Sequence, residues 1–267
     1  MNKKINISVY IVLAIVAAGV FALANCRGTK PAAAADAKTE QTTARIDLPK
    51  INPDDQIVSH MAYTLCYDEQ HEQARWVAYM LTRERASGQI ARADNFRPDE
   101  MVKTGSAQLA DYKRSGYSRG HLCPAQDMKW DSVAMSETFL LSNMSPQLQT
   151  FNDGIWKKIE NRVHSWALQY DTLYVVTGPL LKPGLPTIGE SRVSVPEAFY
   201  KVVYDPARGK MVGWIVPHEN LKTTAPKLAV TVDEVEAATG IDFFSALPDE
   251  LENAMESTYS RDDWNWK

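Results

Sequence analysis

The chain has 267 residues, of which 45% are hydrophobic and 23% are charged. These fractions support a packed core and exclude a disordered or collagen-like chain. The net charge is −4, and it falls to −6 without the first 26 residues, which carry two lysines and no acid. Residues 113–162 hold seven Lys/Arg against five acids, whereas residues 233–263 hold ten acids against one arginine. Net charge alone therefore does not indicate a polyanionic ligand.

Segment 1–26 has the pattern of an export signal or a membrane anchor. Two lysines precede an uncharged, mainly apolar run, Ile5–Ala24, which is typical of a signal peptide and, at about 20 residues, long enough to span a bilayer. Leu23-Ala24-Asn25 before Cys26 resembles a bacterial lipobox, although its third residue is not the preferred small one. An acylated Cys26, an uncleaved anchor and a released form stay open. All three place the following domain outside the cytoplasm, and the first two tether it to the membrane on the periplasmic or cell-surface side.

Residues 27–53 are rich in Ala, Thr, Lys and Asp and lack apolar periodicity, which predicts a flexible tether. A single folded domain is expected over residues 54–267. Within it, four runs have the β-branched and aromatic enrichment of buried strands: Trp76–Thr82, Leu173–Gly178, Phe199–Tyr204 and Met211–Val216.

Three helices are expected in the second half of the chain. The first has an apolar stripe of residues spaced three to four apart: Ile155, Ile159, Val163, Trp166 and Tyr170. The second begins with a capping box, Thr231-Val-Asp-Glu234, and ends at Gly240. The third covers Leu247–Ser257, with Pro248 in its first turn. The irregular alternation of strands and helices predicts an α+β fold.

Two cysteines, Cys66 and Cys123, lie within the expected domain. In an oxidising compartment they could form one disulfide, and the alternative is a pair of buried thiols. The sequence leaves both open.

The polar residues most typical of chemistry gather in three segments: Tyr117–Pro124, Leu141–Gln147 and Phe151–Trp156. His121 beside an arginine is by itself a weak sign of catalysis, because most such histidines are surface or core residues.

The first expected helix carries a polar row beside its apolar stripe. Asn152, Glu160 and His164 are separated by multiples of four residues, so they share one side of the helix. Asn152 is expected near the helix N-terminus, where free backbone N–H groups favour anions such as phosphate. The alternative is that Asn152 is only an N-cap and that Glu160 and His164 form a solvated pair.

The order of these motifs resembles the DNA/RNA non-specific endonuclease family, which includes secreted bacterial nucleases and mitochondrial endonuclease G. The matching blocks include Trp76-Val-Ala-Tyr79, Arg119-Gly120-His121, Leu141-Ser142-Asn143, Ser145-Pro146-Gln147, Asn152 with Trp156 and Glu160, Val176-Thr177-Gly178-Pro179, Val195-Pro196, Phe199-Tyr-Lys-Val202, and Val230 to Glu234 with Thr239-Gly240. They cover roughly residues 60–250. The resemblance implies the ββα-metal nuclease fold, with helices packed on the faces of a central antiparallel sheet.

Three site roles follow from this resemblance. His121 resembles the general base that takes a proton from the attacking water. Asn152 resembles the single direct protein ligand of Mg²⁺ (or Mn²⁺), a hard ion that keeps several of its waters. Glu160 resembles the carboxylate that holds one of those waters. The implied activity is metal-dependent, sequence-nonspecific hydrolysis of DNA and RNA, because contacts made chiefly to phosphate carry no sequence code.

Further roles and two departures also follow. Arg119 resembles a catalytic residue that shapes the site, Asn143 one that supports the histidine loop, and Arg92 a phosphate-binding arginine. Ser118 stands where the family most often has aspartate, and we expect it to touch neither the base nor the metal ligand. His164 stands where some members have arginine, so a substrate-binding role is expected for it. A charged His164 beside a neutral His121 predicts a bell-shaped pH profile.

Two other functions stay open on the sequence alone. One is a catalytically inactive nucleic-acid-binding module, and the other is a hydrolase of other phosphodiesters that uses the same residues. The presence of all three residues that the resemblance assigns to the reaction, His121, Asn152 and Glu160, favours the nuclease.

Overall fold

A seven-stranded antiparallel sheet forms the centre of the computed structural model, which describes residues 45–267. Its strands are, in spatial order, β1 (Gln56–Ser59), β2 (Tyr63–Asp68), β3 (Gln73–Thr82), β6 (Thr172–Pro179), β9 (Ala198–Asp205), β10 (Lys210–Pro217) and β11 (Ala229–Val230). The four strands predicted from the sequence are β3, β6, β9 and β10, and they occupy the middle of the sheet. The short strands β1, β2 and β11 were not predicted.

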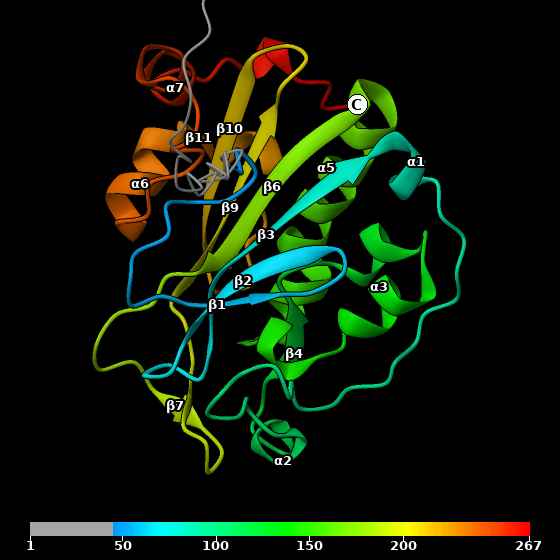
Figure 1. Cartoon of the computed structure of the whole chain (residues 1–267), viewed down its shortest axis with the longest axis vertical. Helices are drawn as coiled ribbons and strands as arrows, with labels where there is room; N and C mark the ends of the chain where they lie inside the picture. Colours follow the sequence, from blue (N-terminus) through cyan, green and yellow to red (C-terminus); the bar gives the residue numbers. More distant parts are fainter. Residues whose placement is uncertain (1–44) are drawn as a thin grey trace, which may run out of the picture. The chain divides into compact units, whose positions relative to one another are not determined.

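Both faces of the sheet are covered, which explains why its central strands are almost continuously apolar. Along β3, alternate residues enter opposite cores, with Val77 and Tyr79 in one and Trp76 and Ala78 in the other. The first core is completed by α5 (Lys157–Tyr170), and the second by α6 (Val232–Thr239) and α7 (Asp249–Glu256). Figure 1 shows α5 on one side of the sheet and the two orange C-terminal helices on the other. The predicted α+β architecture is confirmed.

The remaining elements are short and lie in connections. They are α1 (Arg83–Ala86), α2 (Leu109–Tyr112), α3 (Ser132–Glu137), α4 (Gln149–Phe151), the 3₁₀ turns Ala125–Met128, Leu141–Asn143, Ala225–Lys227 and Arg261–Asp263, the π turn Asn152–Trp156, and the two-stranded ribbons β4 (Ser118–His121) with β5 (Met144–Gln147) and β7 (Thr187–Ile188) with β8 (Val193–Ser194).

The helix signals in the sequence act as expected, with one shift. Thr231 caps α6 by accepting a hydrogen bond from the Glu234 backbone N–H, and the Glu234 carboxylate accepts one from the Thr231 backbone N–H. Gly240 ends this helix at φ +67°, a conformation that glycine adopts at little cost. Pro248 is the N-cap of α7 and lies just outside its first turn.

Segment 45–53, which composition assigned to the tether, lies against the domain. Leu48 is buried in the second core, and the Lys50 backbone N–H donates to the Asp242 carbonyl at 2.8 Å. The predicted export segment 1–26 and residues 27–44 of the tether lie outside the described residues. Within residues 45–267, the structure holds no helix with the length and hydropathy that crossing a bilayer requires.

The two cysteines of the domain are buried free thiols. Cys66 belongs to the second core and Cys123 to the first, so the sheet separates them. The thiol alternative is therefore the one that the fold adopts.

Candidate active site

The β4–β5 ribbon and the helical segment that follows it form the two sides of a cleft. In the ribbon, His121 pairs with Met144 and Gly120 with Ser145. Gly120 has no room for a side chain, because a Cβ there would lie 2.1 Å from Cδ of Gln147. Its lack of a side chain leaves room for the side chain of Gln147, from β5, to pack over the strand that carries His121.

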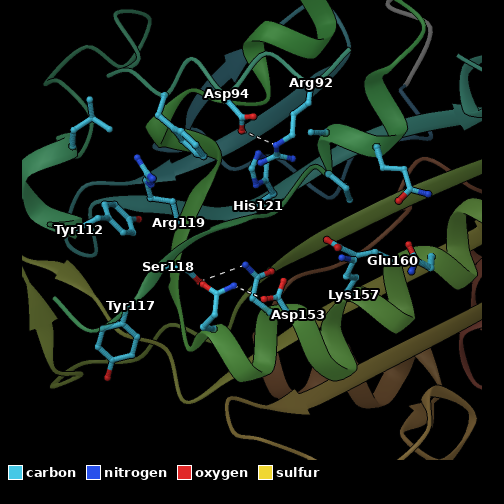
Figure 2. A pocket seen from close by; sticks show the side chains of 18 of the residues that line it. Arg92, Asp94, Tyr112, Tyr117, Ser118, Arg119, His121, Asp153, Lys157 and Glu160 are labelled. Atoms are coloured by element: carbon cyan, nitrogen blue, oxygen red, sulfur yellow. Dashed lines mark hydrogen bonds and ion pairs between the residues drawn. The ribbon is translucent and has the colours of Figure 1, made fainter. Parts of the chain in front are cut away.

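The cleft has a volume of about 830 Å³, and five of the residues predicted for the site line it: Arg92, Arg119, His121, Asn152 and Glu160. Figure 2 shows Arg92, Arg119 and His121 on one side, facing Asp153, Lys157 and Glu160 on the other. A loop, a ribbon and a helix thus contribute to a single polar cavity.

Two phenylalanines hold the base and the arginines together. The His121 ring meets Phe96 and Phe139 edge to face, with centroid distances of 5.9 and 5.1 Å. Arg119 lies over the Phe96 ring at 3.9 Å, and Arg92 lies over the Phe139 ring at 4.7 Å. Each guanidinium is thereby placed beside the imidazole without a hydrogen bond to it. Burial and the charges of Arg92 and Arg119 lower the pKa of His121 to about 3, which keeps the imidazole neutral at neutral pH.

Asn152 lies inside the helical segment and is not its N-cap. The segment begins with α4, and the Asn152 backbone N–H already donates to the Leu148 carbonyl at 2.9 Å. The π turn that starts at Asn152 contains Gly154 with non-helical angles, φ −93° and ψ −114°. Such turns commonly re-aim side chains at functional sites. The expectation of free N–H groups at Asn152 is therefore wrong, and its side chain is what faces the cleft.

Ser118 contacts this side chain, contrary to the expectation from sequence. Its Oγ accepts a hydrogen bond from Asn152 Nδ2 at 3.4 Å and donates to the Gln147 carbonyl at 2.8 Å. Because Nδ2 is engaged by Ser118, the amide Oδ1 is left for a ligand.

Glu160 presents a buried carboxylate that lacks a donor. Among residues 45–267 its Oε1 is buried without a hydrogen-bond partner. Burial raises the pKa of Glu160 to about 8, against the opposing charges of Lys201 and Lys157. Lys201 is fully buried behind the cleft with Nζ 4.9 Å from the centroid of Trp156. A carboxylate with a buried oxygen that lacks a donor is stabilised by a cation or a bound water.

Comparison with known proteins agrees with this geometry. A family model of DNA/RNA non-specific endonucleases matches residues 42–250. The mitochondrial endonuclease G of Homo sapiens is 34% identical over 205 residues, which is 70% of this chain and 69% of that protein. A nuclease of Nostoc sp. is 31% identical over 222 residues, covering 78% and 80% of the two chains. A crystal structure of the EndoG/EndoGI complex has a TM-score of 0.68 at 32% identity, covering 74% of this chain and 89% of that one.

The chain belongs to the DNA/RNA non-specific endonuclease family. It is therefore a nuclease that hydrolyses phosphodiester bonds, and the family is generally metal-dependent. The α+β architecture of the sheet and its helices is that of the family's ββα-metal fold. The inactive binding module that the sequence left open is set aside.

Asn143 does not line the cleft of this endonuclease, although it was predicted among the catalytic residues. It is fully buried, its Oδ1 accepts from the Cys123 backbone N–H at 2.8 Å, and its Nδ2 donates to the Cys123 and Thr138 carbonyls at 3.0 and 2.9 Å. The side chain thus fixes the backbone two residues after His121. Asn143 is a positioning residue, which agrees with the expected support of the histidine loop.

His164 also lies outside the lining of the cleft, in an adjoining pocket that shares Arg92, Ala125 and Gln126 with it. Its Nδ1 is 2.8 Å from Oδ1 of the buried Asp127, whose other oxygen accepts from the Tyr79 hydroxyl. His164 is one helical turn, about 5.4 Å, beyond Glu160 along α5. Substrate binding by His164 and the bell-shaped pH profile that would follow from it stay predictions.

Sequence reasoning missed several charged residues of the endonuclease site. Lys113, Lys157 and Asp94 line the cleft, and Asp94 pairs with Arg92 at 2.6 Å. Lys157 precedes Glu160 by three residues on α5, and that helical spacing was a usable signal. Lys113 and Asp94 lie in loops without periodicity, and no local pattern marks them.

Proposed function

We propose that this chain is a metal-dependent endonuclease that cuts DNA and RNA without sequence preference, with His121 as its general base. The observation that carries the proposal is the position of the His121 imidazole, which lies beside two arginines in a cleft shared with Asn152 and Glu160. Its lowered pKa agrees with the role of a base that is neutral at neutral pH. The relatives named as endonuclease G and nuclease support the same activity.

The donors in the cleft fit a divalent cation of the Mg²⁺ or Mn²⁺ class. Asn152 offers an amide oxygen, and Glu160 offers a buried carboxylate oxygen without a donor among the described residues. Hard cations prefer such oxygen ligands, and Mg²⁺ keeps several waters when few protein ligands are present. Asn152 would hold the ion directly and Glu160 would hold one of its waters. When bound, the ion supplies charge relief on the phosphate and on the leaving oxygen.

The residues of the chain supply the rest of the reaction. The imidazole of His121 takes a proton from water as the water oxygen attacks phosphorus, and the bond from phosphorus to the leaving oxygen breaks. Arg92, Arg119 and Lys157 bind phosphate oxygens and balance their charge. None of these groups reads a base edge, so any sequence that fits the cleft is a substrate.

Digestion of circular plasmid DNA with and without EDTA tests the proposal. We expect nicked and linear products in Mg²⁺ or Mn²⁺ and none in EDTA. His121→Ala should lower the rate at least about 10²-fold because it deletes the base. His164→Gln is the control, and we expect it to stay within about tenfold of the parent, since His164 does not line the cleft. A folded His121→Ala protein that cuts at the parent rate would exclude His121 as the base.

Two further arms define substrate and metal. RNA should be cut as well as DNA, whereas a small aryl phosphodiester should be a poor substrate because it cannot contact the cations along the cleft.

Asn152→Ala should move the Mg²⁺ midpoint of activity to higher concentration and be partly rescued by excess metal. Identical metal titrations in parent and variant would show that Asn152 is not a ligand.

A further inference from the structure

An acidic cluster lies on α6 and α7, across the sheet from the catalytic cleft. Asp233 and Glu236 come from α6, and Glu256 comes from the last turn of α7. One carboxylate oxygen of each lies within 4.8 Å of the other two. These helices pack on the second core, whereas α5, which carries Glu160 of the cleft, packs on the first core at the other face of the sheet (Figure 1).

Glu256 is the residue that distinguishes this cluster from an ordinary acidic surface. It is only 4% exposed, and its Oε1 is buried without a hydrogen-bond partner among residues 45–267. The other acids of residues 45–267 whose side chains are as deeply buried all accept a hydrogen bond: Asp99, Asp111, Asp127 and Asp205. The partly exposed Glu160 and Glu252 each also have one buried oxygen without a partner among these residues. An unpaired buried carboxylate is costly, so a missing partner is expected here.

The charges that face Glu256 make the missing partner a cation. Burial and the neighbouring acids Glu236, Glu252, Asp233 and Asp242 raise the pKa of Glu256 to about 9. Lys50 is close enough to act on Glu252, but its ammonium pairs with Asp242 at 3.2 Å. No ammonium or guanidinium in the described residues forms an ion pair with Asp233, Glu236 or Glu256.

We propose that Asp233, Glu236 and Glu256 bind a Ca²⁺ ion that joins α6 to α7. Glu236 Oε1 accepts a hydrogen bond from the Phe243 backbone N–H at 2.7 Å, so the three carboxylates have up to five further oxygens to offer. Ca²⁺ takes about six to eight oxygens, water among them, at roughly 2.4 Å in irregular geometries. Oxygens on opposite sides of such an ion are about 4.8 Å apart, which accommodates the observed spacing. Soft metals are disfavoured because the set holds no cysteine or histidine.

Bound Ca²⁺ stabilises the C-terminal part of the domain and takes no part in cleavage. Val232, Val235 and Met255 of the two helices pack in the second core, so an ion between the helices holds this packing in place. It also offsets the excess of acids in residues 233–263.

Calcium binding is tested on the full chain by calorimetry and thermal unfolding. The Asn152→Ala background lowers the contribution of the catalytic ion. We expect CaCl₂ to raise the unfolding temperature in this background, and Glu256→Gln to weaken Ca²⁺ binding on the order of tenfold or more and to remove the shift. Glu250→Gln is the matched control, because it removes one exposed acid from the same helix. It should keep the parent affinity.

Activity provides a separate readout. Glu256→Gln in the otherwise native chain should cut plasmid DNA in Mg²⁺ at the parent rate, since the cluster lies outside the cleft. The proposal would be overturned if the parent and Glu256→Gln bound Ca²⁺ with the same midpoint concentration. It would also be overturned if CaCl₂ did not raise the unfolding temperature of the parent. Both results are independent of the catalytic role of His121.

Discussion

At the scale of single residues, the environment of His121 sets its protonation. The ring packs against Phe96 and Phe139, which also contact each other, and two guanidinium groups lie beside it. Burial and positive neighbours both disfavour the imidazolium form. A general base is active only when neutral, so the site keeps the base ready over a wide pH range.

We predict that the His121 imidazole does not titrate near pH 6.5 in the metal-free protein. Burial lowers its pKa to about 3, so its contribution to folding is complete above about 6.5 and is lost as the pH falls toward 3. NMR of the ring nitrogens between pH 4 and 8 measures this directly. Arg92→Gln should raise the pKa, because it removes a positive charge beside the ring. An imidazole that becomes protonated near pH 6.5 would contradict the prediction.

At the scale of elements, His218 fixes the start of the helical segment that carries Asn152. Its Nε2 accepts from the Leu148 backbone N–H at 2.7 Å, and its Nδ1 donates to the Pro196 carbonyl at 2.8 Å. Leu148 is the N-cap of α4, so the histidine replaces a capping side chain. This pair of bonds requires the neutral ring, and burial lowers the pKa of His218 accordingly.

His218→Ala should destabilise the protein by about 1 to 3 kcal/mol for each backbone group left without a partner. Because the folded pKa is lowered, the contribution of His218 is complete above about pH 6.5 and is lost as the pH falls below that value. The difference between parent and variant in urea unfolding should therefore shrink between pH 7.5 and 5. A pH-independent difference would assign the loss to packing against Phe151 and Phe199 alone.

At the scale of the whole molecule, a chain with a net charge of −4 binds a polyanion through local cations. Arg92, Lys113, Arg119 and Lys157 line the cleft, and the acids of α6 and α7 are separated from it by the sheet. Asp94, Asp153 and Glu160 also line the cleft, so its four basic residues exceed its three acidic ones by one, and the net charge of the chain says little about the site.

Salt should weaken DNA binding in proportion to the cleft cations. With about four phosphate contacts, affinity should fall roughly 10²-fold between about 50 and 200 mM salt, as measured on the inactive His121→Ala protein. Lys157→Gln should reduce the slope of log affinity against log salt by about 1. Lys158→Gln is its matched control, because this neighbour does not line the cleft. Equal slopes for the two variants would contradict the assignment of Lys157 to phosphate binding.

The four middle strands of the sheet and the long helix could be predicted from the sequence, because burial imposes a pattern of apolar residues along the chain. The apolar runs of β3, β6, β9 and β10 and the stripe from Ile155 to Trp166 are buried as predicted. The motifs around His121, Asn152 and Glu160 identified residues that do line one cleft. These signals are local or ordered along the chain, so no tertiary contact was needed to find them.

The contacts between segments distant in the chain could not be predicted from the sequence and follow from how the segments fold together. Ser118 meets Asn152 across the cleft, His164 turns to Asp127, and Cys66 and Cys123 lie on opposite faces of the sheet. The spacing of Asn152, Glu160 and His164 predicts that they share one side of the helix. It does not predict how far along the helix axis the cleft extends. Asp233 and Glu236 of α6 likewise lie close to Glu256 of α7 only because both helices pack on the same sheet. Packing between separate elements leaves no periodicity in the sequence.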